Sequence, residues 1–318
     1  MENNPIVTII CLTFNQEQYV RDCLEGFLSQ QTTFPYEVLI YDDASTDLTP
    51  DIIREYVAKY PSIFKPTFYT TNNYSRGLGF VGLYTGIKEA KGKYVAYCEG
   101  DDYWTDPHKL QKQVSFLDTN LKYSVCAHET WVISDKDRNS VVQLFSKLNS
   151  YSFISLDKQT YTFDDALAGN IFHVSSMMYR NQVIDLPPWI SRISACDMVL
   201  FKMLAREGDI YVMSDTMSAY RNHSDSLTSS FKEYTSVISF YELSIKVLRL
   251  MNRYWDRKHQ AKIYPLISRY YIECTLLSIH RRKPVTTKAK EAALLSWYYD
   301  KWVFCKYLMK GLIKKVIR

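Results

Sequence analysis

The sequence has 318 residues, 47% of them hydrophobic and 15% aromatic, and a formal net charge of +5. This composition excludes an intrinsically disordered chain, and the length allows one large domain or one domain with an appended module. Residues 281–318 carry eleven lysines and arginines against two acids, a net of +9, which leaves −4 for the rest. We therefore expect a mildly acidic body and a basic region with an anionic partner.

The seven cysteines are scattered along the sequence without a CxxC pair. This pattern predicts a reducing compartment and argues against a zinc site or a disulfide framework. The first residues lack the basic and apolar regions of a signal peptide, and no apolar run is long enough to span a membrane. The sequence therefore predicts a cytoplasmic protein.

Strand-like and helix-like segments alternate from residue 6 to residue 117. Continuous apolar runs rich in β-branched residues predict strands buried on both faces, and amphipathic segments between them predict helices. Such alternation is typical of βαβ units and a mostly parallel sheet. The expected strands are 6–12, 37–41, 65–71 and 94–98, and the expected helices are 18–29, 49–60, 83–90 and 108–117.

The rest of the sequence is less regular, apart from residues 234–280, where tyrosines and leucines at helical spacing predict helices. The expected domain boundary lies between residues 228 and 229. Before it we expect strands at 123–133, 174–179 and 210–213, helices at 163–167 and 196–206, and a loop or excursion at 134–155.

Polar residues follow three of the expected strands, where Thr13 and Asn15, then Asp43, then Asp101 and Asp102 occur. The carboxyl ends of parallel strands meet at one edge of a sheet, so we expect these residues to share one crevice. Neither GxGxxG after the first strand nor GxxxxGK[ST] occurs in the sequence. A dinucleotide site and a P-loop are therefore poor explanations of the crevice.

Glu99, Asp101 and Asp102 place three carboxylates within four residues, directly after a buried strand. Like charges held this close repel one another, and the usual remedy is a hard divalent cation such as Mg²⁺ or Mn²⁺. A solvated acidic turn is the alternative explanation. The convergence of polar clusters favours a site for a nucleotide and a metal ion.

Five segments in this order resemble the family 2 glycosyltransferases of the GT-A fold, over about residues 5–225. They are VTIICLTFN, EVLIYDDASTD, KGKYVAYCEGDDYWTDPHKLQKQ, SACDMVLFKMLAREG and AYRNHSDS. The variant EGDDYW with TDPHKL is similar to the branch that assembles bacterial polysaccharides. The resemblance implies an α/β GT-A domain at residues 1–228, with a mostly parallel Rossmann-like sheet, and a helical region at 229–318.

The resemblance also implies roles for the matching residues. Asp43 would accept the N3–H of a uracil-type base, Asp101 would contact the ribose or diphosphate, and Asp102 would bind a bridging Mn²⁺ or Mg²⁺. His223 matches a position near the diphosphate or the metal ion. Asp197 matches the general base, although an acid at a helix start is also an ordinary N-cap.

Thr13, Asn15 and Glu99 join the expected nucleotide-sugar-binding set, with Glu99 in place of the first aspartate of the family's Asp-x-Asp. The sequence departs again after residue 81, where it has Gly82-Leu83-Tyr84-Thr85-Gly86 and many members carry an Ala-Arg-Asn triplet before a glycine. Arg76 is the candidate substitute for that arginine.

The implied reaction moves a hexosyl or N-acetylhexosaminyl group from a nucleotide-sugar to a hydroxyl of a saccharide or lipid-linked acceptor. A UDP-sugar is the first candidate donor. One base and direct attack predict inversion at the sugar. His173, Ser176 and Trp104 are the candidate acceptor contacts, and burial in the core is the alternative for each.

Two other functions stay open. A nucleotidyltransferase on a related sheet usually carries a glycine-rich loop with a basic residue after the first strand, which residues 13–17 lack. A non-catalytic module that binds nucleotide-sugars is the second. For such a module we expect that a titration detects no metal-dependent binding of nucleotides.

The basic region combines a row of cations with a row of apolar side chains, which is typical of a helix lying on an anionic membrane. This surface would suit a lipid-carried acceptor and predicts a peripheral position on the inner face of the plasma membrane. The alternative is a helix packed on the body, and nucleic acid is not expected because no nucleic-acid-binding fold accompanies the charge. The residues are Lys306, Lys310, Lys314 and Arg318 in the basic row, Phe304, Leu308, Leu312 and Val316 in the apolar row, and the preceding Trp297, Tyr298 and Trp302.

Overall fold

The computed structural model packs into two compact units, residues 1–223 and 224–318, and each is described by itself. The described residues are 4–134, 140–147, 156–181, 184, 186–187, 189–193, 196–223, 234–280, 297–302 and 305. The expected boundary between residues 228 and 229 lies outside the described residues and stays a prediction.

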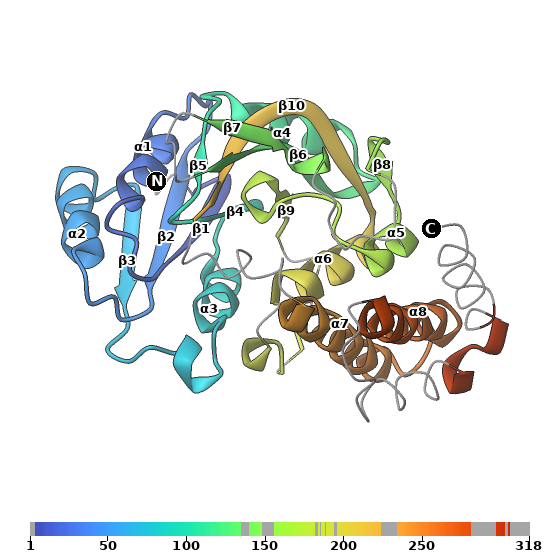
Figure 1. Ribbon diagram of the computed structural model, residues 1–318. Coiled ribbons are helices and arrows are strands. Elements are labelled where there is room, and N and C mark those ends of the chain that lie inside the picture. Colours follow the sequence, from blue (N-terminus) through green and yellow to red (C-terminus); the bar gives the residue numbers. More distant parts are fainter. Residues whose placement is uncertain are drawn as a thin grey trace. The chain divides into compact units, whose positions relative to one another are not determined.

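Unit 1 is built on one mixed sheet with the strand order β3-β2-β1-β4-β9-β6-β10-β5, to which β7 adds at β6 and β8 at β10. Figure 1 shows helices on both sides of this sheet. The strands are β1 (Val7–Thr13), β2 (Tyr36–Asp42), β3 (Phe64–Phe68), β4 (Tyr94–Glu99), β5 (Tyr103–Trp104), β6 (Tyr123–Ser134), β7 (Val141–Leu144), β8 (Thr160–Tyr161), β9 (Met178–Arg180) and β10 (Asp209–Asn222). The α-helices are α1 (Val20–Leu28), α2 (Thr49–Lys59), α3 (Val81–Glu89), α4 (Lys109–Thr119), α5 (Phe163–Ala168) and α6 (Cys196–Glu207), and the 3₁₀ turns are η1 (Tyr74–Arg76), η2 (Phe145–Lys147), η3 (Val174–Ser176) and η4 (Ile190–Arg192).

The first four strands are parallel, with Val7 opposite Tyr36 on one side and Tyr94 on the other. Alternate residues of β1 face opposite layers. Val7, Ile9 and Cys11 pack into the core that α1, α2 and α4 cover. This arrangement confirms the βαβ units expected from the alternating segments and brings the ends of β1, β2 and β4 to one edge.

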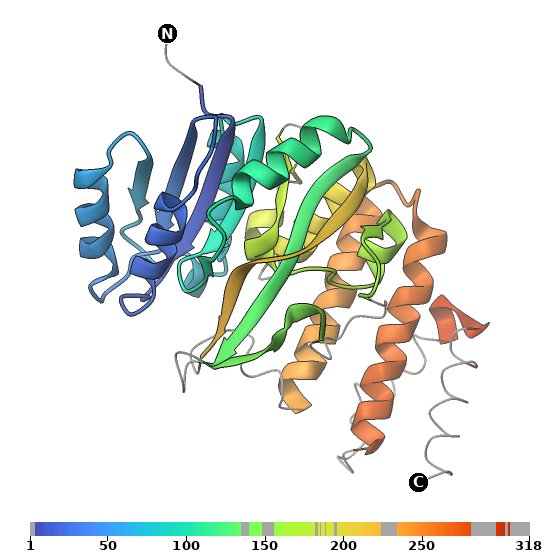
Figure 2. The same ribbon diagram turned by 90° about the horizontal axis from the view of Figure 1, so that it is seen from above.

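The other face of β1 is covered by α3, which packs unusually close. A Cβ at Gly82 would lie 2.8 Å from Leu12 Cδ2 and 2.9 Å from Tyr41 Cβ, so a side chain there would push the helix away. Figures 1 and 2 show α3 on the opposite side of the sheet from α4. This close approach accounts for a glycine at position 82.

The second half of the sheet differs from what we expected. Residues 174–179 form η3 and only the start of β9, and β9 runs antiparallel between β4 and β6. The strand expected at 210–213 is the first part of β10, which continues to Asn222 through register shifts between Met213 and Ser218. Part of the expected loop at 134–155 is β7. The sheet is therefore more mixed than expected.

Unit 2 contains α7 (Tyr234–Tyr254) and α8 (Gln260–His280), which pack against each other. The rings of Tyr241 and Tyr270 lie 5.5 Å apart, and Arg249 donates to the Tyr271 hydroxyl at 2.7 Å. Within the part of the chain that the structure describes, no helix is both long and apolar enough to cross a membrane. These helices confirm the helical pattern of residues 234–280.

Candidate active site

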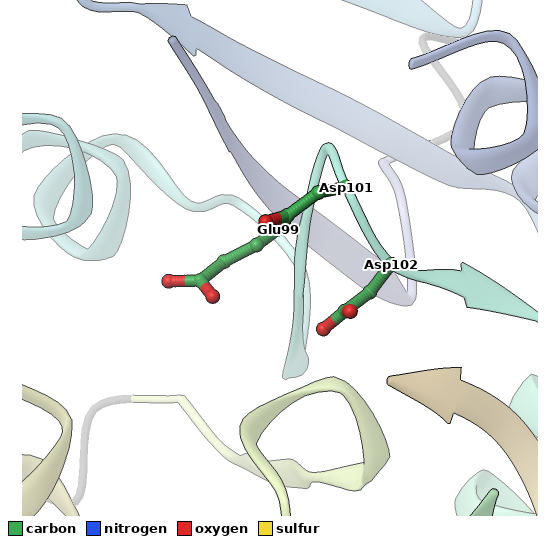
Figure 3. A group of neighbouring side chains, drawn as sticks. All are labelled: Glu99, Asp101 and Asp102. Atoms are coloured by element: carbon green, nitrogen blue, oxygen red, sulfur yellow. The ribbon is translucent and has the colours of Figure 1, made fainter. Parts of the chain in front are cut away.

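Three carboxyl groups leave the turn between β4 and β5, as Figure 3 shows. One ligand oxygen from each of Glu99, Asp101 and Asp102 lies within 4.8 Å of the others. The turn sits directly on the loop after β1, because a Cβ at Gly100 would lie 2.5 Å from Gln16 Oε1 and 2.6 Å from Thr13 Cγ2. The acidic cluster, as we call these three residues, is therefore held close to the end of β1.

Among the described residues, hydrogen-bond donors reach only some of the carboxylate oxygens of the acidic cluster. Burial, and then the charge of Asp101, raises the pKa of Glu99 to about 8, and burial also raises the pKa of Asp102. Asp101 Oδ1 and Asp102 Oδ2 are buried without a hydrogen-bond partner among the described residues. Carboxylate oxygens in this state are the ligands that Mg²⁺ and Mn²⁺ prefer, so the cluster fits a hard divalent cation.

The end of β10 contacts both aspartates of the acidic cluster. The backbone N–H of Arg221 donates to Asp102 Oδ1 at 3.0 Å, and the guanidinium donates to the Asp101 carbonyl at 2.8 Å. His223 Nε2 lies 3.1 Å from Asp101 Oδ2. The structure thus brings His223 to the acidic cluster, and its role as a metal ligand stays a prediction.

The loops after β1 and β2 are bonded to each other. The Thr13 hydroxyl donates to Asp42 Oδ1 at 2.9 Å, and Asn15 Oδ1 accepts from the backbone N–H of Thr46 at 2.8 Å. Asn15 has a left-handed backbone, with φ of 50°. The side chains of Thr13 and Asn15 thus shape the two loops through these hydrogen bonds.

Asp43 anchors the loop that follows β3. Its carboxylate accepts from the backbone N–H groups of Asn73 at 2.8 Å and Tyr74 at 2.9 Å, and from the Asn73 side-chain amide at 2.8 Å. Arg76 lies exposed at the end of η1, on the same loop. A carboxylate has about four acceptor positions, so Asp43 keeps one for a further donor.

Asp197 is the second residue of α6 and lies within electrostatic reach of the acidic cluster. Burial raises its pKa, while a hydrogen bond from the Met198 backbone and the charge of Lys202 lower it. The charge of Asp197 in turn helps to raise the pKa of Glu99. Asp197 therefore accepts a hydrogen bond at the start of its own helix and also lies near the acidic cluster.

The three candidate acceptor residues are largely buried, and His173 lies beside Asp102. His173 Nδ1 is 2.8 Å from Ser175 Oγ and 3.6 Å from Asp102 Oδ2, and burial lowers the His173 pKa to about 4. Ser176 Oγ donates to the His173 carbonyl at 2.7 Å. The Trp104 indole is 3% exposed and donates to the Ser175 carbonyl at 2.9 Å. Their contact with an acceptor stays a prediction.

Arg221 and its partner Asp22 on α1 were not expected at the site. One signal was present, because Arg221 stands two positions before the expected site residue His223 and alternate residues of an extended chain point to the same side. The strand was expected to end at residue 213, so this alternation was not applied to the YRNH segment.

A family model described as "Glycosyl transferase family 2" matches residues 8–185. An uncharacterized protein of Mycobacterium tuberculosis (strain H37Rv) is 37% identical over 242 residues, which are 74% of this chain and 64% of that protein. The chain thus spans less than two thirds of the length of this relative. The putative teichuronic acid biosynthesis glycosyltransferase TuaG of Bacillus subtilis (strain 168) is 25% identical over 81% of this chain and 95% of its own.

Two solved structures share the fold. S. aureus TarS (residues 1–349) in complex with UDP-GlcNAc matches with a TM-score of 0.56 and 18% identity, over 96% of this chain and 92% of its own. The mannosyltransferase PcManGT of Pyrobaculum calidifontis, in complex with GDP-Man and Mn²⁺, matches with a TM-score of 0.51 and 16% identity, over 99% and 88%. These likenesses confirm the GT-A fold class expected from the motifs.

Proposed function

The chain belongs to glycosyl transferase family 2, and we propose that it is an inverting, metal-dependent glycosyltransferase. In this proposal it moves a sugar from a nucleotide-sugar to a hydroxyl of a saccharide or lipid-linked acceptor, and a UDP-sugar is the first candidate donor. The observation that carries the proposal is the acidic cluster, with buried oxygens that have no hydrogen-bond partner among the described residues, within electrostatic reach of Asp197.

The cluster and His223 would hold the divalent cation. Asp102 Oδ2 and Asp101 Oδ1 are the first candidate ligand atoms, because both are buried and lack hydrogen bonds among the described residues. When bound, the cation supplies Lewis-acid stabilisation of the negative charge on the diphosphate leaving group. PcManGT, which shares the fold, is described in complex with Mn²⁺, and Mn²⁺ is therefore the first ion to test, followed by Mg²⁺.

Asp197 would act as the general base. The acceptor hydroxyl oxygen forms a bond to the anomeric carbon while the bond from that carbon to the diphosphate oxygen breaks, and the hydroxyl proton passes to the Asp197 carboxylate. A single displacement inverts the anomeric configuration. Burial raises the pKa of Asp197, which makes this carboxylate a better proton acceptor than an exposed one.

Asp43 and the bonded loops after β1 and β2 would bind the nucleotide. The remaining acceptor position of Asp43 suits the N3–H of uracil, and Arg76 is exposed on the loop that Asp43 anchors. TarS is described with UDP-GlcNAc and PcManGT with GDP-Man, so both bases belong in the test.

The experiment is a donor screen with UDP-sugars and GDP-sugars, with and without Mn²⁺. We expect Mn²⁺-dependent thermal stabilisation and slow hydrolysis of at least one UDP-sugar. Binding of no nucleotide-sugar under any condition would contradict the proposal. Release of pyrophosphate from a nucleoside triphosphate and a sugar phosphate would assign a nucleotidyltransferase instead.

For the acceptor we propose a growing surface polysaccharide, such as a capsule or lipopolysaccharide chain, at an anionic membrane. TuaG is named for teichuronic acid biosynthesis, which supports a polysaccharide role. In unit 2, Trp297, Tyr298 and Trp302 are 44%, 78% and 71% exposed, as expected for side chains that anchor at a membrane surface. The basic row at 306–318 lies outside the described residues.

Vesicle sedimentation tests the membrane proposal. We expect binding to vesicles that contain phosphatidylglycerol, weaker binding to neutral vesicles, and a loss when Trp297, Tyr298 and Trp302 are all replaced by alanine. Equal sedimentation of the triple variant and the wild type would contradict the proposal.

A further inference from the structure

Arg221 lies near the end of β10 and connects three separate parts of unit 1. Its backbone N–H bonds Asp102 Oδ1 at 3.0 Å, and its guanidinium bonds the Asp101 carbonyl at 2.8 Å. The same guanidinium forms an ion pair with Asp22 of α1. One side chain thus joins α1, β10 and the turn of the acidic cluster.

Two aromatic rings enclose the guanidinium. The Arg221 Cζ lies 4.5 Å from the ring centroid of Tyr103 and 5.3 Å from that of Tyr19. Arg221 is only 9% exposed, so these contacts are shielded from water. A planar guanidinium suits stacking and paired hydrogen bonds, and lysine cannot reproduce this geometry.

The contacts of Arg221 leave one side of Asp102 open. Oδ1 of Asp102 accepts from the Arg221 backbone, whereas Oδ2 is buried without a hydrogen-bond partner among the described residues. His223, the residue after β10, reaches Asp101 Oδ2 at 3.1 Å. The end of β10 therefore orients both aspartates and leaves one oxygen of each for another ligand.

We propose that Arg221 is a positioning residue that fixes the turn of residues 99–102, so that Asp102 Oδ2 and Asp101 Oδ1 stay in place for the divalent cation. The inference rests on the proposed function, because it concerns the same cation. It predicts that Arg221 acts on the affinity for the cation without contacting it.

The test measures binding of Mn²⁺ in the presence of UDP by calorimetry for the wild type, Arg221→Lys and Asp22→Asn. Residues that orient metal ligands typically change metal affinity by about 10–100-fold when replaced. We expect Arg221→Lys to raise the Kd for Mn²⁺ about tenfold. Asp22→Asn, at an exposed helix position that keeps the fold, should raise it by less.

Arg180→Lys is the matched control. Arg180 is also a partly buried arginine that donates to backbone carbonyls, those of Tyr123 at 2.9 Å and Leu117 at 2.5 Å. It pairs with Tyr94, at the opposite end of β4 from Glu99. This variant should lower Tm while its Kd for Mn²⁺ stays at the wild-type value.

The outcomes separate the two proposals. If the wild type binds no Mn²⁺ with UDP, the proposed function fails and this inference fails with it. If the wild type binds and both Arg221→Lys and Asp22→Asn bind equally well, only the role of Arg221 is wrong. Should Arg221→Lys not fold, the Asp22→Asn titration decides, and an unchanged Kd there overturns the inference.

Discussion

The two halves of the sheet in unit 1 meet the acidic cluster in different ways. Around β1 and β2 the loops bond to one another, through the Thr13–Asp42 contact and the anchoring of the next loop by Asp43. Around β9, β6 and β10 the contacts come from single groups, chiefly Arg221 and His173. The hydrogen-bonded loops of the first half thus form one frame, the bonded frame, whereas the second half supplies separate groups that can be replaced one at a time.

Replacing Asp102 tests the cluster itself and should have the largest effect. Asp102→Asn removes a candidate metal ligand, and we expect Mn²⁺-dependent transfer to fall about a thousandfold, since metal stabilisation of a leaving group is worth several kcal/mol. Tm should not fall, because the change removes a buried charge whose Oδ2 has no hydrogen bond among the described residues. Asp51→Asn, an exposed acid on α2, is the control, and equal rates in the two variants would contradict the site.

Replacing Asp197 tests whether the second half of unit 1 contributes to the chemical step and not to the binding of Mn²⁺ and the nucleotide. We expect Asp197→Asn to lower kcat by about 10²–10³, the usual contribution of a general base. The affinity for Mn²⁺ and the nucleotide should stay within about threefold of the wild type, since the bonded frame is intact. Calorimetry and initial rates on the same protein separate these effects, and a loss of binding that matches the loss of rate would contradict the assignment.

Lys109 of α4 lies buried where the two halves join. Its ammonium donates to Gln113 Oε1 at 2.8 Å and lies 4.0 Å from the Trp104 ring centroid. Gln113 in turn bonds the carbonyls of Cys126 on β6 and Ser176 on η3. Burial lowers the Lys109 pKa from 10.5 to about 7.

This pKa predicts how stability changes with pH. Between pH 7 and 10.5 the unfolded chain holds a proton on Lys109 that the folded protein has released, so the free energy of unfolding of the wild type rises with pH. Lys109→Met lacks this slope, and the difference between variant and wild type should shift by about 2 kcal/mol from pH 7 to pH 9. Urea denaturation at both values measures it. Lys112→Met, at a half-buried position on the same helix where the ammonium pairs with Asp106, should show no such shift.

Thr13→Val tests the bonded frame and should have the smallest effect. It keeps the shape of the side chain but removes the hydrogen bond to the buried Asp42 carboxylate. We expect the free energy of unfolding to fall by about 1–2 kcal/mol, measured by urea denaturation. Thr119→Val, at the exposed end of α4, should stay within about 0.5 kcal/mol of the wild type, and a similar loss there would contradict the role of the Thr13 bond.

The first half of the sheet could be predicted closely from the sequence. The strand expected at 6–12 is β1 at Val7–Thr13, and the helix expected at 49–60 is α2 at Thr49–Lys59. β1, β2 and β4 contain continuous apolar runs, and each strand of this half pairs with a neighbour one helix away along the chain or with β1, so local pattern and final pairing agree. The family resemblance, which rests largely on these segments, is confirmed by the family match over residues 8–185.

The second half could not be predicted as well, for physical reasons. In β10 the polar residues Ser214, Asp215 and Thr216 sit at a bulge, where the alternation of apolar and polar residues breaks. The broken alternation predicts the end of a strand at this point. β9 has three residues between two antiparallel partners, too few for a periodic pattern. The spacing to His223 is a local signal for Arg221, but the partners of Arg221 on α1 and in the acidic turn come from contacts across the whole unit, which no local pattern contains.

The ion pair between Asp22 and Arg221 joins residues 199 positions apart. Contacts between such distant parts of a chain form late, because a large loop has to close first. During synthesis the helix with Asp22 leaves the ribosome long before β10 is translated. We therefore expect newly made chains that stop before residue 209 to form the early strands yet lack the contacts of Arg221 with the acidic turn, so the proposed cation binding should appear only near the completion of this unit.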